Sequence, residues 1–216
     1  MNKLEIINVT EDFVKRKLKG DSTGHDWYHI ERVRRYAIYI QKKENKGDRF
    51  VLEMSALLHD IDDWKLKNDN EKVAIKWMDK IGLDNLLKEK ILKIIEEVSF
   101  KGALVNSKPS TIEGKILQDA DRIDSIGAIG IARAFAFGGK KGQQIYDESI
   151  PIKYHKSFEE YKSSETTSIN HFYEKLLLLK ELMNTKTGHK IAKRKHRFML
   201  KFLKEFYREW NEFKGI

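Results

Sequence analysis

The stretch Leu57-Leu58-His59-Asp60-Ile61 places a histidine and an aspartate at the end of a run of apolar residues. Val51, Met54, Leu57 and Leu58 recur at the three- and four-residue spacing of one helix face, which predicts a helix that runs into His59. Two polar groups at the end of an apolar helix are costly to bury unless a partner binds them. The stretch therefore predicts a helical fold with a ligand-binding pair at the end of one core helix.

Two other predicted helices carry polar groups of the same kind. His29 shares a helix face with Val33 and Tyr36, in a helix for which Asp26 is the expected N-cap. Asp121 lies in an apolar helix predicted over 112–135, where a carboxylate needs a cation or several hydrogen bonds. Imidazole and carboxylate groups together suit a divalent metal ion. We therefore expect one shared ion to be held by His29, His59, Asp60 and Asp121.

Three further groups near these positions have open roles. Asp119 and Asp121 are two residues apart, so on a regular helix they point about 200° from each other and cannot both reach one ion. Asp124 shares a face with Asp121 and is an accessory candidate, although Asp119 and Asp124 also fit solvated or ion-paired helix acids. His25 is a second accessory candidate, four residues before His29, and equally fits a histidine packed beside the helix cap.

The rest of the chain reads as helical, with only two prolines in 216 residues. We predict an all-α protein of one domain over residues 1–216. Its core spans about 20–135, a long connection covers 136–163, and C-terminal helices over 164–216 pack on the core. Further helices are predicted over 73–81, 86–98, 165–183 and 187–213.

The amino-acid composition limits which compartments and which kinds of partner are expected for the protein. The absence of cysteine excludes disulfides and thiolate zinc sites. The N-terminus lacks a signal-peptide layout and no stretch approaches the roughly 20 apolar residues of a membrane span, so we expect a cytoplasmic protein without a membrane partner. Eight Lys or Arg and no acid lie between Lys186 and Lys204, which leaves 34 basic against 33 acidic residues elsewhere.

A partner for that basic stretch would be nucleic acid, an anionic substrate or an acidic face of another subunit. Basic helices with an apolar stripe are usually just solvated amphipathic helices, however, so nucleic acid is not the expected partner. The aromatic-rich terminal helices also leave a homodimer open.

The order of the four expected ligands resembles the HD-domain superfamily of metal-dependent phosphohydrolases. In that superfamily a histidine on one helix is followed by His-Asp at the end of another and by an Ala-Asp-Arg motif on a later one. The likeness extends over about residues 20–210 and is closest to the YedJ/YpgQ-like bacterial subfamily. It rests on the stretches Gly24–His29, Leu58–Ile61, Ser99–Gly102, Gln118–Arg122 and Thr167–Tyr173. The resemblance favours Asp121 over Asp119 and implies an HD-domain helical bundle with additional C-terminal helices.

The same resemblance implies hydrolysis of nucleotides, in particular nucleoside triphosphates with release of pyrophosphate. Manganese is the expected metal, with Fe, Co, Ni, Zn or Mg as alternatives. Asp63 is similar to an acid found after the dipeptide in some HD nucleotidases and is expected to orient or deprotonate water; Asp62 competes, and both also fit acids that end a helix in solvent.

Cations in or beside the motifs are expected to bind the substrate's phosphates, against a reading as ordinary salt bridges; they are Arg32, Lys65, Lys101 and Arg122. Two alternative functions remain. One is a phosphomonoesterase or cyclic phosphodiesterase on the same site, and the other is a catalytically silent nucleic-acid-binding or assembly module that uses residues 186–204.

Overall fold

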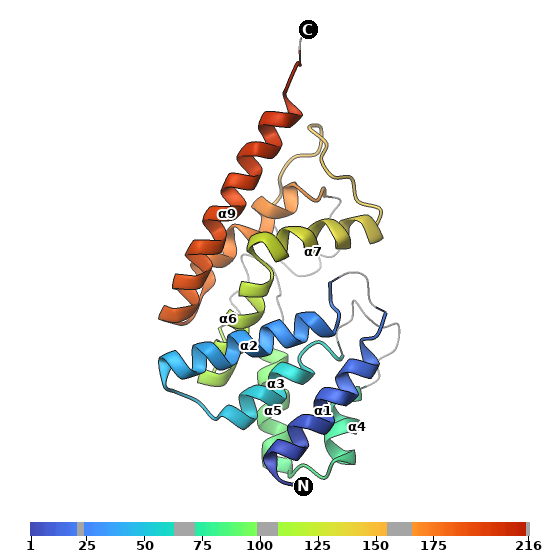
Figure 1. Ribbon diagram of the computed structural model, residues 1–216, viewed down its shortest axis with the longest axis vertical. Coiled ribbons are helices and arrows are strands. Elements are labelled where there is room, and N and C mark those ends of the chain that lie inside the picture. The colour runs from blue at the N-terminus through green and yellow to red at the C-terminus, as the bar shows by residue number, and fades with distance from the viewer. Residues whose placement is uncertain (21–23, 63–71, 99–107, 155–165, 215–216) are drawn as a thin grey trace.

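The computed structural model describes residues 1–20, 24–62, 72–98, 108–154 and 166–214, and every regular element in these ranges is helical. The all-α prediction is therefore confirmed (Figure 1). No helix in the described ranges is long and apolar enough to cross a bilayer.

The first six helices enclose one hydrophobic core (Figure 1). Helix α3 lies at its centre, because every residue from Phe50 to Leu58 is buried. The surrounding helices pack their apolar faces against α3 or against each other. The six are α1 (Lys3–Lys17), α2 (Trp27–Glu44), α3 (Arg49–Leu58), α4 (Val73–Lys80), α5 (Asn85–Val98) and α6 (Ile112–Asp124). His59 and Asp60 thus directly follow α3, the most buried helix of this core.

A second core lies beside the first and is built around Phe172. It contains α7 (Gly127–Lys140), a π-helical turn η1 (Phe172–Leu176), a 3-10 turn η2 (Leu178–Leu182) and the long helix α9 (Lys186–Trp210). The helix predicted over 165–183 is therefore replaced by two short helical turns, whereas the last predicted helix is confirmed with an earlier end.

The single helix predicted over 112–135 is wrong. The chain forms two helices, because Ile126 adopts an extended conformation and Gly127 has a φ of 78°, which side chains other than glycine rarely adopt. Helix α7 also continues to Lys140, so the connection starts later than expected. The break turns α7 to a new direction, and Arg133 on α7 thereby comes back over Asp124 at the end of α6.

The N-terminus of α9 is fixed to both α2 and α6. Thr185 caps the helix by accepting from the backbone of Gly188, and Glu44 at the end of α2 accepts from the backbone of Thr187. Asp119 on α6 accepts from the backbone and the hydroxyl of Thr185. Backbone donors that a helix start leaves open are thus satisfied by side chains from two other helices.

Candidate metal centre

Four side chains from three helices converge at one place. His29 lies in the first turn of α2, where Asp26 accepts from its backbone at 2.9 Å as the predicted N-cap. His29 Nε2 is 3.1 Å from Asp60 Oδ2 and 3.6 Å from Asp121 Oδ1. His59 Nε2 is 3.4 Å from Asp60 Oδ1 and 4.0 Å from Asp121 Oδ1. Ligand atoms bound to one octahedral ion at about 2.1 Å lie about 3 Å from their neighbours, so these separations fit a common ion.

Both imidazoles keep one ring nitrogen available for such an ion. His29 Nε2 and His59 Nε2 are buried, and neither has a hydrogen-bond partner of acceptable geometry. The other nitrogen of each ring is engaged: His59 Nδ1 is 2.9 Å from the carbonyl of Ala56, and His29 Nδ1 is 2.8 Å from Asp124 Oδ2. A carbonyl only accepts, so Nδ1 of His59 carries the proton and Nε2 carries the lone pair. This is the arrangement of a metal-ligating histidine held by a hydrogen bond on its far side.

Asp124 is fully buried and holds several of these groups in place. It accepts from His29 Nδ1, from Arg32 Nε at 2.7 Å and from Arg133 Nη1 at 2.9 Å. Burial alone would favour the neutral acid, but the bonds from His29 and Arg32 hold the pKa of Asp124 far below its ordinary value. The carboxylate therefore stays ionised and orients the His29 ring; its accessory role at a metal site stays a prediction.

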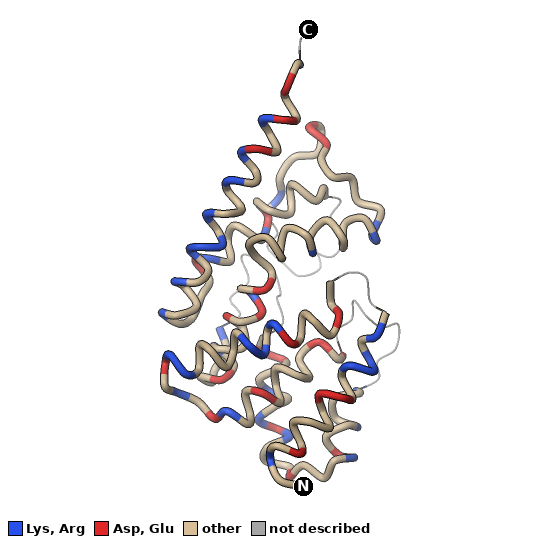
Figure 2. The backbone as a smooth tube through the Cα atoms, viewed as in Figure 1, with Lys and Arg blue, Asp and Glu red and all other residues tan. Residues whose placement is uncertain are grey.

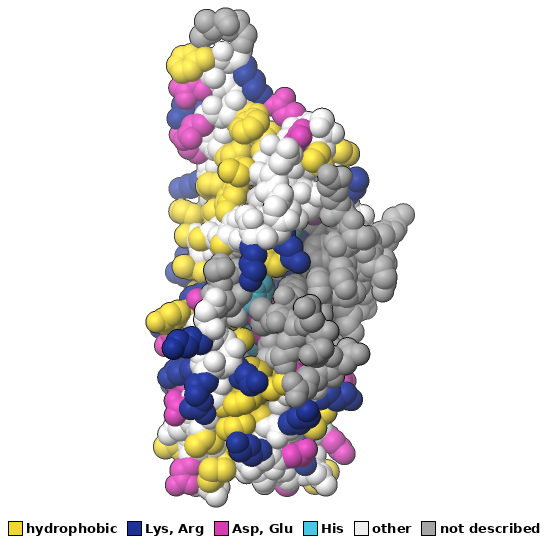
Figure 3. All heavy atoms as spheres, turned by 90° about the vertical axis from the view of Figure 1, so that its right-hand side faces the viewer, with side chains coloured by type: hydrophobic (Ala, Val, Ile, Leu, Met, Phe, Trp, Pro, Cys, Tyr) yellow, Lys and Arg dark blue, Asp and Glu magenta, His cyan; other side chains and the backbone are white. Residues whose placement is uncertain are grey.

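The charges at the centre favour an ionised Asp60. Burial opposes ionisation, but the positive charge that His59 and His29 carry when protonated, together with a hydrogen bond from His29, holds the pKa of Asp60 well below its usual range. The Asp121 side chain is 27% exposed, whereas His29 is almost wholly buried, so the centre opens to solvent on the Asp121 side. Figure 3 shows histidine surface in a hollow between the upper and lower parts of the molecule.

Two of the cations expected to meet phosphate are engaged with the protein. Arg32 binds Asp124 through two nitrogens, and Arg122 is buried and donates to the carbonyl of Leu182. To bind a substrate phosphate, Arg32 or Arg122 would have to use donors that these bonds leave over, so phosphate binding by either side chain stays a prediction. Lys65 and Lys101 lie outside the described residues.

The remaining candidate site residues, three aspartates and a histidine, do not lie together at the metal centre. Asp62 accepts from the backbones of Val73 and Ala74 at 2.8 and 3.0 Å and so caps α4, while Asp63 lies outside the described residues. The ring of His25 is half-buried, with its centroid 5.9 Å from that of His29. Asp119 is fully buried and not solvated, and its hydrogen-bond partners within the described residues are the backbone and side-chain donors at the start of α9.

Sequence reasoning missed Arg133 and the Ala56 carbonyl. Arg133 reaches the centre only because the chain turns after α6, and no local pattern marks that turn. The Ala56 carbonyl could have been found from spacing alone, since it precedes His59 by three residues at the end of a helix.

Comparisons with known proteins agree with this centre. The HD domain family model matches residues 26–126, which include all four expected ligands. The chain is 37% identical to the protein YpgQ of Bacillus subtilis over 97% of this chain and 96% of YpgQ. A crystal structure of YpgQ in complex with ADP superposes with a TM-score of 0.76 at 35% identity and covers 97% of both chains.

Two other solved structures are similar over nearly the full length. An HD-superfamily hydrolase from Bacillus thuringiensis has 42% identity and a TM-score of 0.73, and it covers 98% of this chain and 100% of its own. A protein from Lactobacillus plantarum has 34% identity and a TM-score of 0.88, with 98% and 99% covered. Together with the His-Asp centre, these similarities show that the chain belongs to the HD-domain family of metal-dependent phosphohydrolases.

Proposed function

We propose that the protein hydrolyses nucleoside triphosphates to nucleoside monophosphates and pyrophosphate. The observation that carries the metal-dependent part is the pair of buried, unpartnered Nε2 atoms of His29 and His59, which face the carboxylates of Asp60 and Asp121. The nucleotide part is supported by the likeness to YpgQ, which was crystallised with ADP.

The proposed ligands of the metal are His29, His59, Asp60 and Asp121, and we propose manganese as the ion. Bound there, a divalent ion would lower the pKa of a water molecule and polarise the phosphoryl group that the water attacks. Asp124 keeps a proton on His29 Nδ1 and so directs the lone pair of Nε2 toward the carboxylates. Asp63 is the proposed acceptor of the water's proton, and Lys65 and Lys101 are proposed to bind the phosphates.

The test is a panel of nucleoside tri-, di- and monophosphates, a cyclic dinucleotide and a simple phosphomonoester, incubated with Mn²⁺ and separated by chromatography. We expect triphosphates to give monophosphate and pyrophosphate in equal amounts. The His59→Ala and Asp60→Ala variants should lose about a hundredfold or more of the rate, because each removes a proposed ligand. His189→Ala is a matched control, since His189 is exposed on α9.

Undiminished hydrolysis by His59→Ala would contradict the proposed centre. Release of inorganic phosphate from monoesters, or cleavage of the cyclic substrate alone, would instead retain the centre and replace the substrate class by one of the alternatives.

A further inference from the structure

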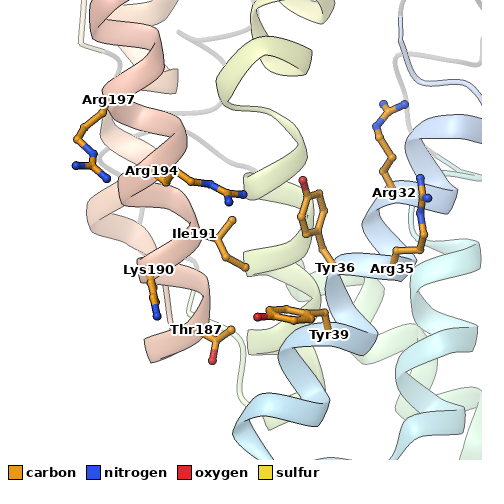
Figure 4. A pocket seen from close by; sticks show the side chains of 9 residues that line it. All are labelled: Arg32, Arg35, Tyr36, Tyr39, Thr187, Lys190, Ile191, Arg194 and Arg197. Atoms are coloured by element: carbon orange, nitrogen blue, oxygen red, sulfur yellow. The ribbon is translucent and has the colours of Figure 1, made fainter.

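A groove separate from the metal centre runs between α2 and the first half of α9 (Figure 4). Its volume is about 770 Å³, which is within the range of sites that bind small molecules or single nucleotides. The residues that line it from α2 are Arg32, Arg35, Tyr36 and Tyr39, and the cations that line it from α9 are Lys190, Arg194 and Arg197. None of the four proposed metal ligands lines this groove.

The α9 cations of the groove have no carboxylate partner among the described residues, whereas Arg32 on α2 is paired with Asp124. Within the described residues, no carboxylate lies at ion-pair distance from Lys190, Arg194 or Arg197, and Arg35 has only a 3.9 Å contact with Glu31. Glu44, which is close to the groove through Thr187, is engaged with the backbone of that residue. Three such cations on one helix, with Arg35 facing them from α2, create a positive potential that attracts anions.

The two tyrosines add a second kind of contact. Their side chains extend from α2 toward α9, and Arg194 reaches across the groove toward Tyr36 (Figure 4). Tyr39 is 48% exposed, and Lys43 Nζ lies 5.8 Å from its ring centre. Lys195 Nζ lies 4.8 Å from the ring centre of Tyr36. Tyr36 is half-buried against the first core, so Tyr39 offers the more open ring. Aromatic rings beside cations are the surfaces on which unpaired bases stack.

The positive surface is longer than one nucleotide. The basic residues of α9 recur at three- and four-residue intervals and so follow one face of the helix for about 27 Å, as the blue segments of α9 in Figure 2 indicate. The residues of this basic row are Lys186, Lys190, Lys193, Arg197, Lys201 and Lys204. A row of this length suits the regularly spaced phosphates of an extended strand.

We propose that the groove and the basic row bind single-stranded nucleic acid, with phosphates along the cations of α9 and bases against Tyr36 and Tyr39. A duplex fits less well, because its bases are paired inside and present no ring face to the tyrosines. This binding activity is additional to phosphohydrolysis at the metal centre; the two sites share Arg32, which lines the groove and binds Asp124 behind His29, but the groove contains none of the proposed metal ligands.

Fluorescence anisotropy tests the proposal with labelled mixed-sequence DNA and RNA strands of 4, 8 and 12 nucleotides, a 12-base-pair duplex, and unlabelled ATP and tripolyphosphate as competitors. EDTA in all samples keeps metal-dependent hydrolysis from consuming the probes and separates this test from that of the proposed function. We expect affinity to rise with strand length. The logarithm of the binding constant should fall with the logarithm of salt concentration with a slope of about −2 or steeper, since each phosphate contact contributes about −0.7.

Two variants separate charge from stacking. Lys190→Ala/Arg194→Ala should weaken binding at least tenfold and make the salt slope shallower by about 1.4. Tyr39→Ala should weaken binding about fivefold or more without changing the slope, and Tyr39→Phe should retain the affinity because the ring is kept. Lys93→Ala/Lys108→Ala is the matched control, because it removes the same charge from two exposed lysines outside the groove.

Equal binding by the groove variant and its matched control would overturn the proposal. So would equal affinity for the 4- and 12-nucleotide strands together with full competition by tripolyphosphate, which would make the groove a site for small anions. A preference for the duplex would equally contradict it.

Discussion

Asp119 and Asp121 stand two residues apart on α6 and have opposite surroundings. Asp119 is fully buried and accepts from the backbone of Asn184 at 2.7 Å and from the backbone and hydroxyl of Thr185 at 2.8 and 2.7 Å. Asp121 is partly exposed and faces the two imidazoles of the metal centre. On a helix, side chains two residues apart point about 200° from each other. Asp119 therefore stabilises the start of α9, whereas Asp121 faces the candidate metal centre.

Substitution of each acid by asparagine should separate these roles. Asp119→Asn should lower the free energy of unfolding by about 1–3 kcal/mol, because an amide cannot accept all the donors that the carboxylate accepts. Metal affinity of the folded protein should be unchanged. Asp121→Asn should instead weaken metal binding with little loss of stability. Denaturant unfolding in EDTA and metal titration by calorimetry measure the two quantities, and the reverse pattern would contradict the assignment.

The expected ligands could be predicted because each is polar within an apolar pattern and their order matches a family motif. The groups that orient them are harder to predict. The sequence pattern of α7 does not mark Arg133 as a residue near a site. Its bond to Asp124 depends on the turn between α6 and α7. The contacts of Arg32 and Arg122 could not be predicted either. A cation beside a motif looks the same in sequence whether it binds substrate, a buried carboxylate as Arg32 does, or a backbone carbonyl as Arg122 does.

At the level of helices, the break between α6 and α7 determines where Arg133 lies. Gly127→Ala should destabilise the protein by about 1 kcal/mol or more, because φ is 78° there and the added Cβ would lie 3.0 Å from Lys195 Cγ. Gly139→Ala in the same helix is the control, since nothing lies within 4 Å of its added Cβ, and it should be neutral or stabilising by up to about 1 kcal/mol. Thermal unfolding of both variants measures the difference, and equal effects would contradict a strained turn at Gly127.

The bond from Glu44 to Thr187 should make the attachment of α9 dependent on pH. Hydrogen bonds from Thr187 lower the pKa of Glu44 from its ordinary 4.5, so the folded state favours the carboxylate. This stabilisation is present above the unfolded-state pKa and is lost as pH falls through the lower folded-state pKa. Glu44→Gln should therefore cost a few tenths of a kcal/mol at pH 7, since solvent screens the group, and the cost should fade as pH falls through the lowered pKa of Glu44. Urea unfolding from pH 3 to 8 measures the difference, and a cost that persists at pH 3 would contradict it.

Helices with a strong local pattern could be predicted within a few residues, and α2, α3, α4 and α5 are of this kind. The break after α6 could not, because Ile123 and Ile126 continue the apolar spacing across it. Helix α1 was not expected, since only Ile7, Thr10 and Val14 are buried and its apolar stripe is correspondingly thin. Its start is nevertheless marked by a capping box between Asn2 and Glu5.

At the level of the whole molecule, two hydrophobic cores meet beside the metal centre. Ile123 belongs to the first core and Ile126 to the second, and Asp124 between them joins α2, α6 and α7 through His29, Arg32 and Arg133. An ion bound at the centre would connect groups that lie far apart in sequence.

Metal binding should therefore stabilise the whole fold. Addition of Mn²⁺ at 100 times its dissociation constant should raise the free energy of unfolding by about 2.7 kcal/mol, because the ion binds the folded state alone. The rise should be absent in His59→Ala and present in His189→Ala. Calorimetric unfolding with Mn²⁺ or with EDTA measures it, and an equal rise in His59→Ala would place the ion elsewhere.

The cap that Asp62 forms on α4 has a consequence for how substrate preference can change. The carboxylate binds the backbones of Val73 and Ala74, so the two ends of the intervening segment are joined directly after the metal ligands. Closure of a loop costs only slightly more when the loop is longer. Extra residues can therefore be inserted between Lys65 and Val73 without displacement of His59 and Asp60. Related proteins can thus change their substrate preference by such insertions while the proposed metal ligands, Asp63 and Lys65 are all kept.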